Sequence, residues 1–186
     1  MRLFVAVELP AVVRGALAAA VDRLRPLALD VAWVASQNVH VTLKFLGEVD
    51  AGRLVAVRDA LGQAAAVDPF DVRVRGLDAF PAPASPRVLW AGIADGAEGL
   101  GMLAHRVDDA LAGAGFPRED RPFAAHVTLG RVRQPRRTPA LAAAIDGARA
   151  LDFGPVHVDQ VVLVRSELSP RGARHTALDV WPLARG

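Results

Sequence analysis

The tetrapeptide His-Val-Thr-Leu occurs twice in this chain, and this repeat limits the possible folds more than any other feature. The first copy lies in VHVTLKFLG and contains His40 and Thr42; the second lies in AHVTLGRV and contains His126 and Thr128. Side chains of a strand alternate between two faces, so the valine and leucine of each copy point away from its histidine and threonine. The repeat therefore predicts two similar strands, each with two aliphatic anchors in a core and an imidazole and a hydroxyl on the other face.

The hydrophobic pattern predicts further strands and helices around the two copies. Apolar residues at helical spacing indicate four helices, which begin after Pro10 and at about Asp50, Ala97 and Pro139. The other expected strands are RLFVAVEL, FDVRVRGLDAF, RVLWAGI, VHVDQVVLVRSEL and HTALDVWPL. No segment has the composition of a linker. We therefore expect one domain over residues 1–186, an α+β fold of two pseudo-symmetric lobes, each an antiparallel sheet with outer helices, and an active cleft between the lobes.

Composition narrows the class of protein. The 186 residues are 52% hydrophobic, enough to bury a core, and contain no cysteine. A disulfide framework, a thiolate nucleophile and a cysteine-based metal site are thereby excluded. The opening MRLFVAVELP meets an acid and a proline too early for a signal sequence or a membrane span. We expect a soluble, cytoplasmic protein with no membrane association and no obligate protein partner.

The basic residues are almost all arginine, because Lys44 is the one lysine in a chain of net charge +2. Arginine binds phosphate through two parallel hydrogen bonds, so a polyanionic ligand fits this composition. Coding bias towards arginine is the alternative explanation. The densest basic run, RVRQPRR at Arg131 to Arg137, follows the second copy directly and is either a solvated loop or an anion contact.

Two histidines and two threonines on facing strands form a set suited to proton transfer at a phosphate. Histidine gains and loses a proton near its ordinary pKa of about 6.5, so a pair can act as general acid and general base. Threonine hydroxyls can donate to phosphate oxygens. The alternatives are purely structural histidines, or a metal site formed by His40, His126 and His157. We expect no metal and no cofactor.

The two motifs resemble the paired His-x-Thr-x signatures of the 2H phosphoesterase superfamily, and more closely the bacterial RNA 2′,3′-cyclic phosphodiesterases of the 2′-5′ RNA ligase family. The similarity extends to RLFVAVELP, WVASQNVHVTLKFLGEV, RPFAAHVTLGRV and VLVRSELSPRGARHTAL. It implies a bilobal fold that hydrolyses RNA 2′,3′-cyclic phosphate ends to 2′-phosphomonoesters. It also implies that His40 is the proton donor, that His126 is the proton acceptor, and that Thr42 and Thr128 hold the phosphate. Running in reverse, such a site would ligate RNA without ATP.

Further positions are assigned one by one, from the resemblance or from their place in the expected elements. Arg131 matches an arginine that often follows the second motif, which implies a substrate contact. Phe4 is expected either to stack on a base or to pack in the core. His175 stands where relatives often carry tyrosine, and we leave it outside the catalytic set. His105 is expected to be solvated, and Trp33, Trp90 and Trp181 to pack in the core or between the lobes.

Two other functions remain open: a cyclic phosphodiesterase for a small nucleotide such as an ADP-ribose cyclic phosphate, and a non-catalytic RNA-binding module.

Overall fold

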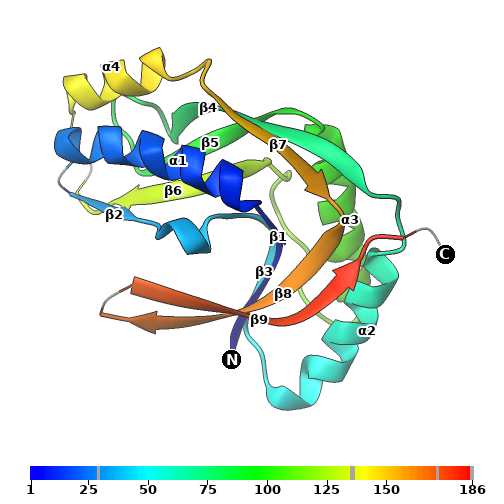
Figure 1. Cartoon of the computed structure of the whole chain (residues 1–186). Coiled ribbons are helices and arrows are strands. Elements are labelled where there is room, and N and C mark those ends of the chain that lie inside the picture. The colour runs from blue at the N-terminus through cyan, green and yellow to red at the C-terminus, as the bar shows by residue number, and fades with distance from the viewer. Residues whose placement is uncertain (29, 135–136, 171, 185–186) are drawn as a thin grey trace.

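The computed structural model describes residues 1–28, 30–134, 137–170 and 172–184. Within these ranges the chain forms nine strands and four α-helices (Figure 1). The strands are β1 (Arg2–Glu8), β2 (Val31–Trp33), β3 (His40–Glu48), β4 (Phe70–Phe80), β5 (Val88–Asp95), β6 (His126–Val132), β7 (Asp152–Val158), β8 (Gln160–Ser169) and β9 (Gly172–Pro182). The helices are α1 (Ala11–Leu24), α2 (Leu54–Ala64), α3 (Ala97–Gly113) and α4 (Pro139–Gly147). Short 3₁₀ turns, η1 (Arg25–Leu27), η2 (Ser36–Asn38) and η3 (Ala51–Arg53), connect some of them.

The strands form one curled antiparallel sheet in the order β7-β4-β5-β6-β3-β1-β8-β9, with β2 added alongside β6. The two motif strands, β3 and β6, meet near its centre, where Val41 pairs with Val127. Because the central residues of the two motifs pair in antiparallel fashion, an approximate two-fold axis relates one motif to the other. The α+β prediction with two similar antiparallel halves is confirmed, and the β3–β6 contact joins the halves.

The two halves of the sheet exchange elements of the chain. Strand β4 follows α2 in sequence but pairs with β5, in the other half, and β8 follows β7 but pairs with β1. Helices cross over as well: α1 packs against β7, whereas α3 packs against α2 and β3 (Figure 1). Each half of the sheet therefore depends on segments from both ends of the chain.

The core lies between the sheet and the helices. The apolar residues at helical spacing in α1, α2 and α3 are buried with one exception, Leu54, which is partly buried at the start of α2; the buried ones are Val13, Leu17, Val21, Leu24, Val57, Leu61, Leu100, Leu103, Val107 and Leu111. A second, small cluster lies on the opposite face of the sheet and consists of Phe4, Ala6, Val162 and Val164. This second cluster forms the floor beneath the site described below.

One predicted strand was wrong, and one short strand was not predicted. The stretch VHVDQVVLVRSEL forms two strands, β7 and β8, instead of one; they are separated at Asp159, whose carbonyl oxygen accepts from the backbone N–H of Leu183 at 2.7 Å. Strand β2 was not predicted, since three residues are too few to show a period. Its pairing with β6 brings Trp33 opposite Gly130.

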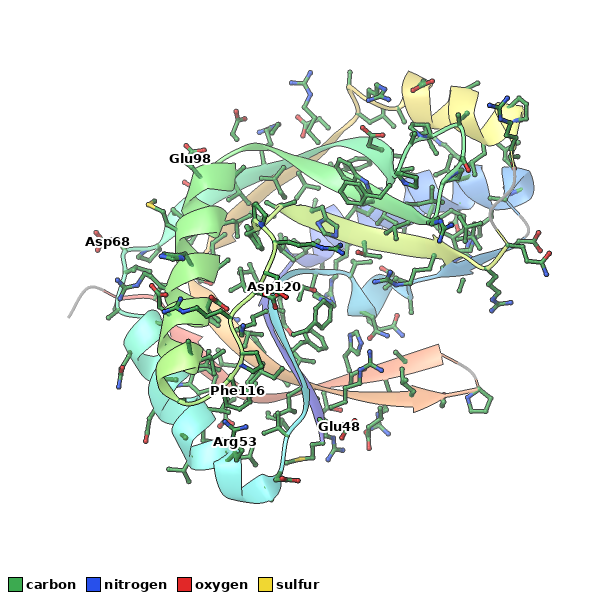
Figure 2. The ribbon with its side chains drawn as sticks, turned by 180° about the vertical axis from the view of Figure 1, so that it is seen from behind. Glu48, Arg53, Asp68, Glu98, Phe116 and Asp120 are labelled. Carbon is green, nitrogen blue, oxygen red and sulfur yellow. The ribbon has the colours of Figure 1, made fainter. Side chains whose placement is uncertain are left out.

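Ionic and cation–π contacts fix α2 and α3 behind the motif strands. The Arg53 guanidinium lies 3.9 Å from the ring centroid of Phe116 and donates to the carbonyl oxygens of Ala114 and Gly115; Figure 2 shows Arg53 and Phe116 close together. Lys44, with 3% of its surface exposed, binds Asp108 of α3 and donates to the carbonyl oxygen of Pro117 at 2.7 Å. The one lysine therefore joins β3 to α3.

Candidate active site

A β-bulge follows the first motif and changes which residues of β3 face the site. Thr42 pairs with Ala6 of β1, but the next pair on β1 is Val5 with Lys44, so Leu43 is an extra residue. A bulge of this kind reverses the alternation of side chains along the strand. Lys44 consequently points to the helix side, and Phe45 joins His40 and Thr42 on the opposite face, where 58% of its surface is exposed.

The second motif carries a bulge at the same place. Thr128 pairs with Trp90 of β5, but the next pair is Leu89 with Gly130, so Leu129 is the extra residue. Arg131 is thereby placed on the face of Thr128. A Cβ atom on Gly130 would lie 2.6 Å from Val31, so glycine is what allows β2 to pair here. The two repeats thus aim Phe45 and Arg131, the fifth residue after each histidine, at one site.

Both motif histidines are held by the same hydrogen bond. His40 Nδ1 lies 2.7 Å from the carbonyl oxygen of Asn38, and His126 Nδ1 lies 2.7 Å from the carbonyl oxygen of Ala124. A carbonyl oxygen only accepts, so Nδ1 carries the hydrogen in each ring and Nε2 is left for proton exchange. In His40 this Nε2 lies 3.0 Å from the Thr42 hydroxyl. The repeat therefore presents two imidazoles in the same tautomer.

Aromatic rings surround His40. Phe4, 3% exposed, stacks on the His40 ring with centroids 4.7 Å apart, and His175 packs edge-on at 5.4 Å from His40 and 5.0 Å from Phe4. Burial lowers the pKa of His40 to about 4, with a further lowering by His175 and an opposing effect of the Asn38 hydrogen bond. Burial also lowers the pKa of His175. His40 is therefore a neutral imidazole near pH 7.

His126 has a more open aromatic environment. Phe80 and Trp90 stack with centroids 4.9 Å apart, and their rings lie 5.6 Å and 6.1 Å from His126. The surface of Phe80 is 41% exposed. Trp90 was expected to pack in the core or between the lobes, but it lies on the motif face beside this histidine because it pairs with Thr128.

A cleft of about 590 Å³ opens in front of the motifs. Of the predicted site residues, it brings together His40, Thr42, Thr128, Arg131 and Phe4. Within the described part of the chain, His126 is outside this lining, although its partner Thr128 is part of it. Phe4 reaches the cleft chiefly as the support of the His40 ring, and its contact with substrate stays a prediction.

The cleft also contains residues that sequence reasoning did not assign to the site. The remaining walls come from β2 and η2, from β1 and β3, and from the β8–β9 hairpin, and include Trp33, Asn38, Phe45, Leu168 and His175. Trp33 was expected to pack in the core or between the lobes; it packs partly on the core and lines the cleft. The sequence WVASQNVHV does place Trp33 and Asn38 just before His40, which is the signal that could have identified them.

The remaining histidines lie elsewhere. His157 is on edge strand β7 and contacts Asp71 at 2.7 Å, and β4, β5 and β6 separate its strand from β3. His105 is exposed and pairs with Asp109 at 3.2 Å, as expected of a solvated residue.

Among the described residues, no group of three or more His, Asp or Glu side chains is placed to hold a metal ion. Nor does the described chain contain a helix long and apolar enough to cross a membrane. For the basic run that begins at Arg131, residues 135 and 136 lie outside the described residues.

Comparison with known proteins identifies the family. The model of the 2′-5′ RNA ligase superfamily matches residues 13–170. This chain belongs to that superfamily. Among relatives, the RNA 2′,3′-cyclic phosphodiesterase of Methanothermobacter thermautotrophicus is 35% identical over 187 residues, covering 98% of this chain and 99% of the relative. The protein of the same name from Archaeoglobus fulgidus is 36% identical, covering 97% and 99%.

Solved structures of other proteins show the same fold. TT0787 of Thermus thermophilus aligns with a TM-score of 0.81 and 35% identity, covering 100% of this chain and 99% of that protein. LigT of E. coli, crystallised with 3′-AMP, aligns with a TM-score of 0.80 and 27% identity, covering 98% and 97%. The predicted membership of the superfamily and the two-lobed architecture are thus confirmed.

Proposed function

We propose that this protein hydrolyses RNA 2′,3′-cyclic phosphate ends to 2′-phosphomonoesters. The observation that carries the proposal is the doubled arrangement of His40 with Thr42 and His126 with Thr128, in which each Nδ1 is bound to a carbonyl oxygen. Membership of the superfamily and the names of the archaeal relatives support the reaction class.

The proposed reaction needs one proton acceptor and one proton donor. Nε2 of His126 takes a proton from water as its oxygen forms a bond to phosphorus. The bond from phosphorus to the 3′ oxygen breaks, and Nε2 of His40 gives a proton to that oxygen, leaving a 3′-hydroxyl and a 2′-phosphate. The hydroxyls of Thr42 and Thr128 donate to the non-bridging oxygens and stabilise the charge that builds up there.

The pKa of His40 bears on this assignment of roles. Burial holds it at about 4 in the protein without substrate, whereas a donor must be protonated when the 3′ oxygen leaves. An anionic phosphate beside Nε2 favours the imidazolium and raises this pKa. We therefore assign the protonation of His40 to the substrate complex, with the phosphate itself supplying the charge.

The difference between the two repeats suggests how the substrate lies. Phe45 offers an exposed apolar ring at the fifth position after His40, and Arg131 offers a guanidinium at the fifth position after His126. An aromatic ring stacks on any base, and a guanidinium binds phosphate. The terminal base is proposed to lie against Phe45 and the backbone phosphate against Arg131.

The same site is proposed to catalyse ligation when a 5′-hydroxyl takes the place of water. The attacking oxygen then loses its proton to one histidine, and the departing 3′ oxygen gains one from the other. The cyclic phosphate supplies the driving force, so no ATP is needed.

Incubation with a short RNA ending in a 2′,3′-cyclic phosphate, in EDTA, tests the proposal. Conversion to a 2′-phosphate end by the protein, and none by His40→Ala or His126→Ala, is the expected result. Conversion only of an ADP-ribose cyclic phosphate would favour the small-nucleotide alternative. Retained RNA binding by both variants with no turnover by the parent protein would favour an RNA-binding module and refute the proposal.

A further inference from the structure

Asn38 contacts two parts of the site at once. Its main-chain carbonyl oxygen accepts from His40 Nδ1 at 2.7 Å, and its side-chain amide donates to the carbonyl oxygen of Ala173 at 2.7 Å. Ala173 belongs to β9, so this second bond crosses from the turn before β3 to the β8–β9 hairpin. One half-buried residue thus connects the orientation of a motif histidine to a distant wall of the cleft.

The hairpin reached by this bond is part of the cleft. Ser166, Leu168, Gly172, Ala173 and His175 all line it, and 69% of the surface of Leu168 is exposed. Figure 1 shows the paired ends of β8 and β9 extending away from the rest of the molecule. The hairpin is therefore one wall of the cleft, so its position affects the shape of the cleft.

The hairpin also reaches His40 by a second route. His175, two residues after Ala173, packs edge-on against the rings of both His40 and Phe4. The Asn38 amide and the His175 ring therefore hold the hairpin against the same histidine from two sides.

The second motif has no such connection. The residue that holds His126 is Ala124, whose methyl side chain cannot form a hydrogen bond. The two motifs therefore differ in what supports the histidine. A main-chain carbonyl oxygen accepts from Nδ1 of each ring, but only the carbonyl oxygen that holds His40 belongs to a residue with a polar side chain.

We propose that Asn38 is a positioning residue that couples the seating of the β8–β9 hairpin to the orientation and tautomer of His40. When the hairpin is seated, the amide bond fixes the backbone of Asn38, and with it the carbonyl oxygen that keeps the hydrogen on Nδ1. The proposal rests on the proposed function, because it assigns Asn38 a part in the proton transfer by His40.

Two variants of Asn38 and a control test the coupling. Asn38→Ala removes the amide that donates to the carbonyl oxygen of Ala173. Asn38→Asp keeps the shape of the side chain, but its carboxylate cannot donate to this oxygen. Asn38→Asp therefore tests the same bond if Asn38→Ala does not fold. We expect kcat on the cyclic-phosphate RNA to fall about tenfold to 100-fold in both, with KM changed less than about threefold, since misplacing a reacting group costs rate more than binding. Asn38→Gln, which keeps an amide donor, should retain more activity than Asn38→Asp. Ser36→Ala, in the same turn, should leave kcat unchanged.

A measurement that does not depend on activity tests the role of Asn38 separately from the proposed phosphodiesterase reaction. Nitrogen-15 NMR of the imidazoles should show the Nδ1–H tautomer for both motif histidines in the parent protein. In Asn38→Ala and Asn38→Asp, the His40 signals should move towards a mixture of tautomers while those of His126 stay fixed. Unchanged His40 signals, or kcat within about twofold of the parent in both folded variants, would overturn the coupling.

Discussion

His40 and His126 differ in what surrounds their rings, although the backbone holds them alike. His40 is partly buried and contacts the rings of Phe4 and His175, whereas His126 lies beside the partly exposed Phe80. A proton donor and a proton acceptor need different pKa values, and the surroundings of each ring set its pKa. Two histidines in different surroundings can therefore take these two roles.

The low pKa of His40 makes stability depend on pH. The folded pKa of about 4 is below the ordinary value, so the unfolded chain binds more protons between these pH values and stability falls as pH drops from about 6.5 to 4. The full effect is at most about 3 kcal/mol and less to the extent that solvent reaches the ring. Urea unfolding at several pH values should show this loss in the parent and a smaller one in His40→Gln. Equal slopes in the parent and His40→Gln would contradict the assignment.

Phe45 should contribute to substrate binding through its exposed ring. Phe45→Ala is expected to raise KM for the cyclic-phosphate RNA about tenfold, since stacking on one base contributes about 1–3 kcal/mol. Phe45→Trp should keep KM close to the parent value. Val55→Ala removes another exposed apolar side chain, on α2, and should have no effect on steady-state kinetics. The same KM for Phe45→Ala and the parent would rule out this role.

At the scale of elements, the bulges decide what faces the cleft. Strict alternation predicts the faces of His40 to Leu43 correctly and then fails at Lys44, which is buried on the opposite face. The extra residue depends on how β3 pairs with β1, a contact between distant segments that no local pattern contains. The shared face of the motif histidines and threonines was therefore predictable from sequence, while the position of Phe45 was not.

The buried pair of Lys44 and Asp108 gives a prediction for the packing of α3. Removing the lysine leaves a carboxylate of low exposure without its main partner, so Lys44→Met should destabilise the protein by about 3 kcal/mol. Replacing both residues, in Lys44→Met with Asp108→Leu, should recover most of that loss. Chemical denaturation of the three proteins measures both differences. A single variant as stable as the parent would show that the pair does not hold α3 on β3.

At the scale of the whole molecule, the halves exchange β4, β8 and helices, and the direct pairing of β3 with β6 brings the motifs together. The sequence predicted two similar lobes, because both copies of the motif and the strands and helices around them follow local patterns. It could not show which strand joins which half, since that depends on packing between segments far apart in the chain. The β8–β9 hairpin, from the end of the chain, reaches His40 only through this exchange.

The charge at the mouth of the cleft predicts a salt dependence. Arg131→Ala should lower kcat/KM on RNA about tenfold and reduce its slope against the logarithm of salt concentration by about one, because one phosphate contact is lost. Arg131→Lys should keep the slope and lose part of the rate. Arg23→Ala makes the same change of charge on α1, outside the cleft, and serves as the control. An equal effect of the two alanine variants would mean that only net charge matters.

The central claim is that His40 and His126 act as one acid–base pair, and single-turnover kinetics of the two alanine variants and their double variant test it most directly. Groups that act as a unit are not additive, so each single variant should lose about 10³-fold or more and the double variant little beyond that. Losses that multiply, or one histidine whose removal costs less than about tenfold, would contradict the account.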